Sequence, residues 1–498
     1  MHLATLVEMI ESGYPDRVLV GGGPGMPLDG SDIGDTVRRG ATTLAGYSSV
    51  VYVGENQARL PCLVLSAVWA GVPFVPLNYR LEDSALQCLI AAQDNSVVIA
   101  DRRSASRLGQ RATIIDDWLR GLTTSPPRHE PADNPDEVAI LLHTSGTISA
   151  PKAALLRHRH LMAYLLGSVE FGSAGPDEAA LVAVPPYHVA GMANMLSNLY
   201  AGRRLVYLPR FSAESWLRTA RAEGITHAMV VPTMLARIVD HLGGATAELP
   251  ALRSLSYGGA KVSERVIRDA LAAFPDTDFV NAYGLTETAS TIAVLGPDDH
   301  RAAVAAEAPE IARRLASAGR VLPTVDVEIR DEAGEAVPLG VRGILHVRGD
   351  QISGEYATGS LLDAGGWFCT RDQAMVDEDG FLFIDGRADD TIIRGGENIA
   401  PAEIEEVLLG HPLVAGACVV GIPDEVWGQR ILAAVVPASG ATLTAEEIQS
   451  TVRERLRGSK TPDLVVFRES LPHTETGKLL RRVVAAEVAA TKPSLVQS

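Results

Sequence analysis

The sequence has few cysteines and no recognisable cysteine pattern. Of its 498 residues only four are cysteine, at positions 62, 88, 369 and 418, and no C-x-x-C pair occurs. This scatter excludes the usual zinc-binding spacings and a disulfide framework. It favours a reducing compartment, so we expect a cytoplasmic protein.

Positive charge is also scarce. The 44 lysines and arginines are outnumbered by 61 aspartates and glutamates, which gives a net charge of −17. A chain this acidic is not expected to bind nucleic acid or an anionic membrane surface. A polyanionic ligand must therefore be bound by local basic groups and backbone amides.

Long uninterrupted apolar runs are missing. Residues 1–13 lack a basic segment and carry Glu8 and Glu11 within their apolar stretch, which argues against a signal peptide. The longest apolar run, residues 61–77, is broken by three prolines and is too short to span a membrane. We expect no stable membrane insertion, and we expect this run to form a buried helix followed by a strand.

The sequence does contain a regular alternation of strand-like and helix-like segments. From about residue 45 to 345, short apolar runs such as SVVYVG, VAILLHT, ALVAVPP and SLSYGG alternate with helical stretches. This alternation predicts an α/β fold with doubly wound layers around largely parallel sheets, where ligands bind beyond the carboxyl ends of strands. The loops after VAILL, LVAVP and FVNAY are the expected positions of a site.

Two changes of pattern suggest domain limits. Residues from about 320 to 385 consist of short strands with Asp/Gly turns, which predicts a β-rich subdomain. The segment GRADD predicts the limit between a large N-terminal body over residues 1–387 and a small mobile C-terminal α+β domain over residues 388–498. Within this domain, Thr444 and Glu447 have the spacing of a capping box.

The segment HTSGTISAPKA, residues 143–153, has the composition of a phosphate-binding loop. We expect it to lie between a strand and a helix, where its backbone amides, its hydroxyls and Lys152 can bind phosphate oxygens. The Walker spacing is absent, and a Ser/Thr-rich surface turn is the alternative interpretation.

Two further segments carry groups suited to a nucleotide. NAYGLTETAS supplies Tyr283, Thr286 and Glu287, which can respectively stack on a purine, bind phosphate and bind Mg²⁺. Asp372 and Arg387, fifteen residues apart, can bind ribose hydroxyls or phosphate. Taken singly, these segments also fit a capped helix start at Thr286 and ordinary Asp/Gly turns.

In this order, the segments resemble those of the adenylate-forming superfamily, which includes acyl-CoA synthetases, firefly luciferase and the adenylation domains of peptide synthetases. The resemblance covers nearly the whole chain and rests on AVWAGVPFVPLNYRL, VPPYHVAGM, SYGGA, NAYGLTET, GRADDTIIRGGENIAPAEIEEVL and TGKLLRR. It implies a ligase that uses ATP and Mg²⁺ to convert a carboxylic acid to an acyl-adenylate. The acyl group is then transferred to coenzyme A and AMP is released.

The resemblance also implies roles for individual residues around the nucleotide. Tyr283, beside Gly284, would stack on adenine, and Asp372 with Arg387 would bind the ribose. Thr286 would contact the α-phosphate and Glu287 would hold Mg²⁺. The β- and γ-phosphates would be bound by Thr144, Ser145, Gly146, Thr147 and Lys152.

Further roles concern the acyl group, the thiol and the small domain. Lys478 would bridge the substrate carboxylate and the α-phosphate, and His188 would lie beside the acyl carbonyl and the thiol. Asp389 would be the hinge about which the small domain turns. The base and acyl pockets would be lined by Gly258, Gly259 and Ala260, and coenzyme A would be met by Gly395, Gly396 and Glu397.

The chain departs from the family pattern at four positions within these segments. The phosphate loop usually reads T-S-G-T-T-G-x-P-K-G, whereas Ile148, Ser149 and Ala153 here replace a hydroxyl residue and two glycines. Arg371 replaces the glycine of the usual T-G-D. The three loop changes affect the pyrophosphate side, where loss of glycine restricts close approach of the backbone.

Three functions therefore remain open. The first is a complete acyl-CoA ligase, and the second is a variant that only carries out thioesterification of an acyl-adenylate supplied by a partner enzyme. The third, a non-catalytic nucleotide-binding relative, is disfavoured by the retained Lys478 and Glu287.

The substrates are less clearly indicated. Residues 187–192, 231–235 and 256–260 carry few charges, which favours an apolar acyl or aryl acid over an amino acid. No carrier domain follows residue 498, which favours free coenzyme A over a tethered arm, and a separate carrier protein is the alternative thiol. We also expect that the protein can form a homodimer.

Overall fold

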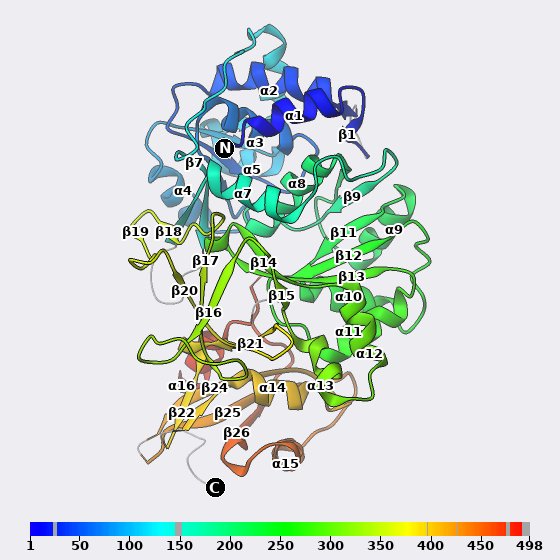
Figure 1. Cartoon of the computed structure of the whole chain (residues 1–498), viewed down its shortest axis with the longest axis vertical. Helices are drawn as coiled ribbons and strands as arrows, with labels where there is room; N and C mark the ends of the chain where they lie inside the picture. Colours follow the sequence, from blue (N-terminus) through cyan, green and yellow to red (C-terminus); the bar gives the residue numbers. More distant parts are fainter. Residues whose placement is uncertain (23–26, 145–151, 396, 425, 475–478, 491–498) are drawn as a thin grey trace.

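Two large mixed sheets form the body of the protein (Figure 1). The computed structural model describes residues 1–22, 27–144, 152–395, 397–424, 426–474 and 479–490. Within these residues the first sheet has eight strands. From edge to edge they are β19 (Gly359–Ser360), β18 (Glu355–Tyr356), β8 (Lys152–Arg157), β7 (Val138–Thr144), β4 (Phe74–Leu77), β3 (Ser49–Val53), β5 (Ser96–Ala100) and β6 (Thr113–Ile114).

The second sheet has thirteen strands within the described part of the chain. From edge to edge they are β16 (Asp326–Arg330), β17 (Gly343–Arg348), β20 (Phe368–Val376), β21 (Phe381–Arg387), β15 (Gly319–Val321), β14 (Ser290–Leu295), β13 (Asp278–Leu285), β12 (Ser254–Gly258), β11 (His227–Val230), β9 (Ala179–Val182), β10 (Arg204–Tyr207), β1 (Val18–Val20) and β2 (Leu28–Asp29). The run from β13 to β1 is parallel, whereas the run from β16 to β14 is antiparallel.

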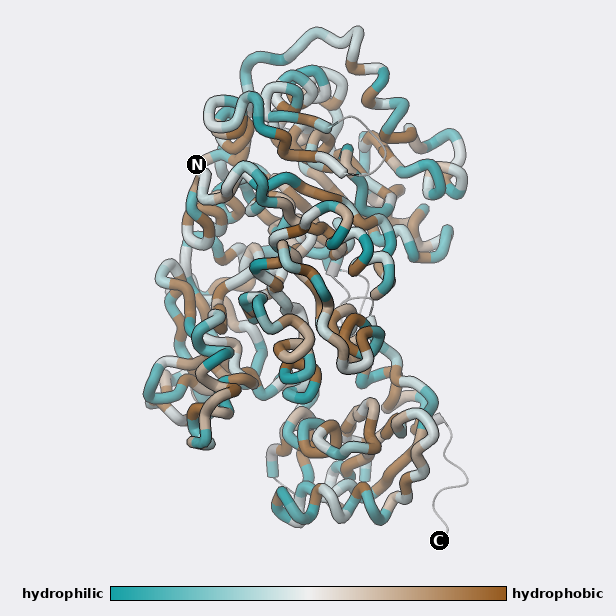
Figure 2. Tube along the Cα trace, turned by 90° about the vertical axis from the view of Figure 1, so that its right-hand side faces the viewer, coloured by the Kyte–Doolittle hydropathy of each residue, from teal (hydrophilic) through white to brown (hydrophobic). Residues whose placement is uncertain are grey.

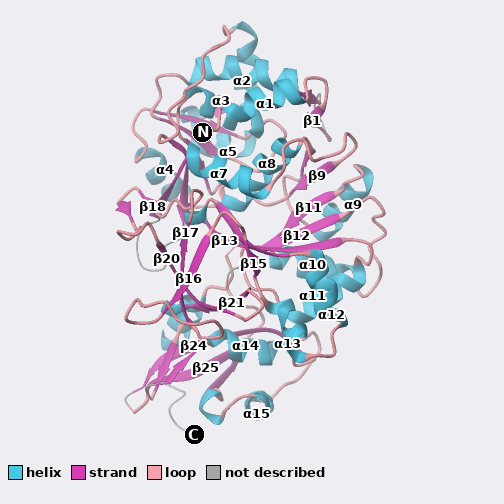
Figure 3. Cartoon of the chain, in the orientation of Figure 1, coloured by secondary structure: helices cyan, strands magenta, loops and turns pink. Residues whose placement is uncertain are grey.

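Helices alternate with the parallel strands and pack around them, as Figure 3 shows. They are α1 (Thr5–Gly13), α2 (Gly30–Leu44), α3 (Leu60–Ala70), α4 (Asp83–Ala91), α5 (Arg102–Leu108), α6 (Ile115–Gly121), α7 (His158–Ser168), α8 (Val189–Ala201), α9 (Ala213–Ala222), α10 (Pro232–Leu242), α11 (Glu264–Ala273), α12 (Pro297–Ala305) and α13 (Pro309–Ala312). The predicted α/β fold with layered sheets is confirmed. Residues 61–77 form the expected buried helix and strand, α3 and β4.

The predicted β-rich segment forms the antiparallel end of the thirteen-stranded sheet. Strands β16, β17, β20 and β21 all belong to it, and they enclose a separate apolar cluster that includes Leu345, Val347 and Phe368. Because β20 and β21 pair in register, Asp372 lies directly opposite Arg387. The segment therefore brings together two residues that lie fifteen positions apart in the sequence.

One expected element differs. We predicted a helix directly after the loop at residues 145–151, but the chain continues as β8, which pairs antiparallel with β7. Ala154 and Leu156 of β8 are buried on one face, so the segment fits the two-residue repeat of a strand better than a helical repeat. The helix α7 begins only at His158, so no helix N-terminus adjoins the loop.

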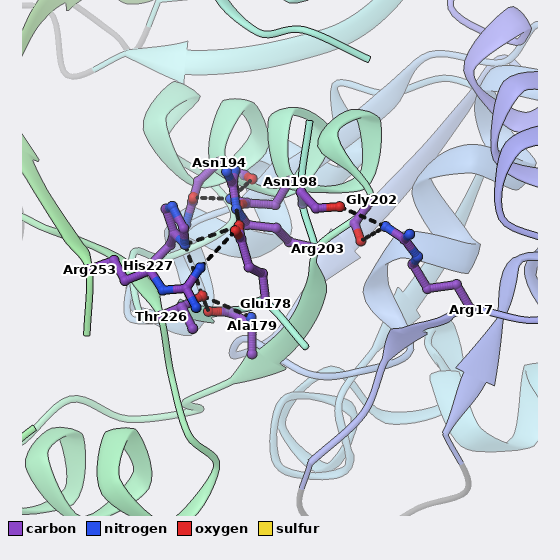
Figure 4. A network of polar contacts seen from close by, with 11 residues as sticks. Arg17, Glu178, Ala179, Asn194, Asn198, Gly202, Arg203, Thr226, His227 and Arg253 are labelled. Atoms are coloured by element: carbon purple, nitrogen blue, oxygen red, sulfur yellow. Dashed lines mark hydrogen bonds and ion pairs between the residues drawn. The ribbon is translucent and has the colours of Figure 1, made fainter. Parts of the chain in front are cut away.

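A polar network joins the amino ends of the parallel strands (Figure 4). Glu178, just before β9, accepts a hydrogen bond from Arg203 Nε at 2.8 Å and one from Arg253 Nη1 at 3.3 Å. His227, the first residue of β11, lies 3.6 Å from the same carboxylate, and burial lowers its pKa to about 4. The network holds the strand starts together at the edge opposite the predicted ligand loops.

Within the described residues, the small C-terminal domain has a three-stranded sheet, a two-stranded sheet and helices, and it is seen as a separate lower lobe in Figure 2. Its elements are β22 (Ile392–Arg394), β23 (Glu397–Ile399), α14 (Pro401–Leu409), β24 (Val414–Asp424), β25 (Gly428–Pro437), α15 (Ala445–Arg455), β26 (Leu464–Phe467) and α16 (Arg481–Ala490). The capping box at α15 is confirmed, because Thr444 N–H donates to Glu447 Oε2 at 2.7 Å and Glu447 N–H donates to Thr444 Oγ1 at 3.3 Å.

The apolar cores of the body and of the small domain are separate. Two clusters of the small domain draw only on residues from 392 to 488, and the other clusters draw on no residue beyond 384. Polar contacts do cross between the two parts, for example Lys261 Nζ to Glu406 Oε2 at 2.8 Å. Among the described helices, none has the length and apolar character needed to cross a membrane.

Candidate active site

Three predicted nucleotide-binding residues, from the strands β13, β20 and β21 of the thirteen-stranded sheet, contact one another. The Tyr283 hydroxyl donates to Asp372 Oδ2 at 2.5 Å, and Arg387 Nη1 lies 3.1 Å from Asp372 Oδ1. Arg387 also donates to the carbonyl of Thr370. The structure thus joins residues from two different sequence motifs into one cluster.

The ionisation states of this cluster follow from its burial. Asp372 is only 5% exposed. Burial, together with the nearby Asp372, raises the pKa of Tyr283 well above its ordinary value, so the phenol remains a hydrogen-bond donor. For Arg387, burial lowers the pKa, but Asp372 and Glu287 raise it further, and the guanidinium stays charged. A carboxylate has about four acceptor positions, so Asp372 can accept further hydroxyl donors.

Glu287 and Lys152 lie on either side of a tyrosine that the sequence did not single out. The Tyr356 hydroxyl donates to Glu287 Oε1, and Lys152 Nζ lies 5.8 Å from the centre of the Tyr356 ring. The backbone N–H groups of Ser353 and Gly354 donate to the Glu287 carbonyl at 2.8 and 3.0 Å. These contacts connect the start of β8 with the short 3₁₀ helix Thr286–Thr288.

The region beside Glu287 suits a magnesium ion bound together with a nucleotide. Among the described residues, no cluster of three or more His, Cys, Asp or Glu side chains could hold a metal ion. Mg²⁺ commonly binds one or two protein carboxylates and takes its other oxygens from phosphates and water. The Glu287 carboxylate fits that pattern.

Thr286 begins this 3₁₀ helix, and Leu285 is its N-cap. The alternative in which Thr286 caps a regular helix is therefore wrong. The helix is short because Ala289, the residue that follows it, has a left-handed φ of 53°.

The phosphate loop itself is described only at its ends. Thr144 is the last residue of β7, and Ser145, Gly146, Thr147, Ile148 and Ser149 lie outside the described residues. Ala153 pairs with His143 across the β7–β8 hairpin, and its carbonyl accepts from Ala357 N–H at 2.9 Å. Its φ is not among the positive ones, so alanine fits the backbone there without strain.

Two of the predicted glycines, Gly258 and Gly284, are required by close backbone approach. A Cβ at Gly258 would lie 2.2 Å from the Ala282 carbonyl oxygen, and one at Gly284 would lie 1.8 Å from that of Ser290. Gly259 has a φ of 88°, which favours glycine, and Ala260 follows it. Gly258 and Gly284 are therefore required by packing and Gly259 by its backbone conformation, independently of any ligand.

His188 lies at the start of α8, where it is the N-cap residue. Its ring packs against Tyr187 at a centroid distance of 4.5 Å. Burial, and to a smaller extent Arg80, lowers the pKa of His188 to about 4, so the imidazole is neutral at pH 7. Its Nε2 atom is buried, and no described residue forms a hydrogen bond with it.

The predicted hinge residue contacts one of the unusual residues. Asp389 lies in the 3₁₀ helix Ala388–Asp390 directly after β21, and its Oδ2 is 3.7 Å from Arg371 Nη1. Arg371 has a φ of 61°, in the left-handed region that favours glycine. The structure thus gives the physical reason why a glycine is expected at position 371.

The structure does not bring the predicted coenzyme A residues to His188. Gly395 and Glu397 lie in the β22–β23 hairpin of the small domain, and Figure 1 shows β22 in the lower lobe, whereas α8 lies in the upper part of the body. The Gly395 N–H donates to the Trp427 carbonyl at 2.8 Å. Gly396 and Lys478 lie outside the described residues.

The chain belongs to the AMP-binding enzyme family. The family model for AMP-binding enzymes matches residues 13–357, and that for the C-terminal domain of AMP-binding enzymes matches residues 403–478. The predicted membership of the adenylate-forming superfamily is confirmed. The chain is an enzyme of the acid–thiol ligase class, and nucleotide binding is a property of this family.

Characterised relatives span nearly the whole chain. A feruloyl-CoA synthase of Amycolatopsis is 34% identical over 450 residues, covering 87% of each chain. An indoleacetate–CoA ligase of Aromatoleum aromaticum is 31% identical over 472 residues, covering 90% of each. The crystal structure of ATP-bound MatB from Rhodopseudomonas palustris superposes with a TM-score of 0.87 at 23% identity, covering 99% of this chain and all of that one, which shows the common fold.

Proposed function

We propose that the protein is an ATP-dependent acyl-CoA ligase that forms an acyl-adenylate and transfers the acyl group to coenzyme A. The observation that carries this proposal is the convergence of Tyr283, Asp372 and Arg387 beside the Glu287–Tyr356–Lys152 contacts. One half of this region suits a nucleoside, and the other suits phosphates with a metal ion.

In the first step, the acid's carboxylate oxygen attacks the α-phosphorus of ATP, the bond to the β-phosphate oxygen breaks, and pyrophosphate leaves. Asp372 accepts hydrogen bonds from the ribose hydroxyls, and Tyr283 stacks on the adenine. Thr286 donates to the α-phosphate, and Lys152 attracts the outer phosphates. Mg²⁺, held by Glu287, would neutralise developing phosphate charge. Lys478 fixes the attacking carboxylate against the α-phosphate.

In the second step, the thiol sulfur attacks the acyl carbonyl, the bond between the acyl carbon and the phosphate oxygen breaks, AMP leaves, and the thiol proton passes to water. The neutral His188 has a ring nitrogen able to accept a hydrogen bond near the acyl group. Rotation about Asp389 would remove Lys478 and bring Gly395, Gly396 and Glu397 to the acyl-adenylate. In Figure 1 the strand β22 lies in the lower lobe and α8 in the upper part of the body, which supports the need for such a rotation.

The alternative is a variant that skips adenylation. Ile148 and Ser149 favour this variant, because they replace residues of the usual phosphate loop. Ala153 does not favour it, because alanine fits the backbone of β8 there without strain. Isotope exchange between pyrophosphate and ATP tests the choice, since exchange requires the first step to be reversible on the enzyme. We expect exchange that depends on the acid. Its absence, with thioester still formed from supplied acyl-adenylate, would favour the variant.

A loop-restoring variant sharpens this test. Ile148→Thr, Ser149→Gly and Ala153→Gly together should raise exchange by roughly tenfold if the native loop binds pyrophosphate poorly, since one charge-assisted hydrogen bond contributes about 1.5–3 kcal/mol. Vigorous native exchange that the triple variant does not improve would show that the loop is a tolerated difference.

The acid is proposed to be apolar or aromatic. This follows from the few charges at residues 187–192, 231–235 and 256–260, and it is in keeping with relatives named for feruloyl and indoleacetate groups. A panel of aliphatic and aromatic acids, tested with coenzyme A and with a carrier protein, identifies both substrates. A strict preference for amino acids would contradict the proposal. The homodimer and the partner enzyme have no support among the described contacts and stay predictions.

A further inference from the structure

Tyr356 occupies an unusual position between two groups that serve the phosphates in the proposed reaction. Its hydroxyl donates to Glu287 Oε1, and its ring lies within cation–π range of Lys152 Nζ, at 5.8 Å. The tyrosine belongs to β18, a strand of two residues near the edge of the eight-stranded sheet. Neither partner is close to it in sequence, so the fold alone creates this contact.

The backbone around Tyr356 is fixed on both sides. Toward the 3₁₀ helix, Ser353 and Gly354 N–H donate to the Glu287 carbonyl at 2.8 and 3.0 Å. Toward β8, Tyr356 pairs with Ala154, and Ala357 N–H donates to the Ala153 carbonyl at 2.9 Å. The segment 353–357 therefore bridges the end of the phosphate loop and the residue proposed to hold the metal.

A bidentate ion pair adds to this attachment. Arg157 Nε donates to Glu355 Oε2 at 2.8 Å, and Arg157 Nη2 donates to Glu355 Oε1 at 2.6 Å. Both side chains are about three-quarters buried. Because the neighbour of Tyr356 is held in this way, the phenol has little freedom to leave Glu287.

The contact leaves half of the Glu287 carboxylate available. The phenol occupies Oε1, and no described residue donates a hydrogen bond to Oε2. A carboxylate usually binds Mg²⁺ through one oxygen, so a hydrogen bond on the other fixes the rotamer without blocking the metal. Fixing of Glu287 matters more here, because Ile148 stands where the family pattern has a hydroxyl residue that could bind phosphate.

We propose that Tyr356 is a positioning residue, which orients Glu287 for the metal ion of the metal–ATP complex and holds Lys152 beside it. This inference rests on the proposed function. It assigns no proton transfer and no substrate contact to the phenol. It predicts that the hydroxyl affects metal binding with ATP, whereas it has no effect on AMP or on the thioester step.

Tyr356→Phe tests the proposal, because it keeps the ring over Lys152 and removes only the hydroxyl. Binding of Mn²⁺, used in place of Mg²⁺ and followed by its electron paramagnetic resonance signal with ATP present, should weaken by roughly tenfold. The Mg²⁺ concentration for half-maximal pyrophosphate exchange should rise by a similar factor, with the maximal rate largely recovered at saturating Mg²⁺. AMP affinity, measured by calorimetry, should be unchanged.

Tyr14→Phe is the matched control, since its buried hydroxyl donates to the Tyr200 carbonyl at 2.8 Å, far from Glu287. It should leave Mn²⁺ binding unchanged. Mn²⁺ affinity within twofold of native in Tyr356→Phe would overturn the proposal, and so would an equal loss of AMP and Mn²⁺ binding, which indicates general damage. If the native protein binds no Mn²⁺ with ATP and shows no exchange, the adenylation step itself fails, and the role of Tyr356 fails with it.

Discussion

The buried carboxylate of Asp372 offers a sharp test of the nucleotide site. Asp372→Asn keeps the size of the side chain but removes its charge and one acceptor oxygen. Tyr283 and Arg387 both contact this carboxylate, at 2.5 and 3.1 Å. The substitution should therefore affect both the stability of the site and its affinity for AMP.

Both effects can be estimated from these contacts. Loss of one charge-assisted hydrogen bond to a ribose hydroxyl weakens binding by about 1.5–3 kcal/mol, which corresponds to a roughly 10- to 150-fold higher Kd for AMP. Arg387 also loses its charged partner. Because the arginine side chain is 33% exposed, water offsets part of that loss, and we expect the free energy of unfolding to fall by about 1–3 kcal/mol.

The measurements are calorimetric titration with AMP and thermal unfolding without ligand. Asp326→Asn is the control, because Asp326 of β16 pairs with Arg348 of β17 at 2.9 Å and both side chains are exposed. Exposed pairs of this kind contribute less than about 1 kcal/mol, so this variant should bind AMP normally. An unchanged AMP affinity in Asp372→Asn would refute the role of this residue in nucleotide binding. Lower stability with normal AMP binding would leave it a purely structural role.

Three further predictions concern the reaction cycle and acid stability. Lys478→Ala should abolish adenylate formation but largely spare thioester formation from supplied acyl-adenylate, and equal losses in both half-reactions would contradict its assignment. Asp389→Pro fixes φ near −65°, so one half-reaction should survive while the other falls by orders of magnitude; two unaffected half-reactions would mean that the hinge lies elsewhere. Burial lowers the pKa of His158 from 6.5 to about 3. Below pH 6.5 the unfolded chain therefore binds a proton that the folded protein does not bind, so the free energy of unfolding falls as the pH falls. Urea unfolding should show that the loss of stability between pH 7 and pH 5 is about 2 kcal/mol smaller in His158→Gln, and parallel losses in the two proteins would contradict this.

The sequence predicted those features that depend on local pattern. The apolar run of residues 61–77 predicted a buried helix and strand, which are α3 and β4. The spacing of Thr444 and Glu447 predicted the start of a helix, which is α15. The strand β8 was missed because AALL fits a helix and a strand equally well, and pairing with β7 decides between them. Long-range pairing overrides a weak local preference.

Part of the site depended on spatial neighbours that a single sequence does not reveal. The family resemblance identified Asp372 and Arg387 individually, whereas the register of β20 and β21 brought them face to face. Tyr356 carried no signal, because its contact with Glu287 depends on the path of β18. Arg371 was recognised as unusual, and its φ of 61° explains the expected glycine.

The separate apolar cores have a consequence for heat denaturation. Since no apolar cluster of the described residues includes both the body and the small domain, few apolar contacts oblige the two parts to melt together. Scanning calorimetry should therefore resolve two endotherms, the smaller one belonging to the C-terminal lobe. AMP, whose proposed contacts lie on β13, β20 and β21, should shift only the larger endotherm upward by mass action. A ligand that also engages the lobe, such as coenzyme A with an acyl-adenylate, should move both.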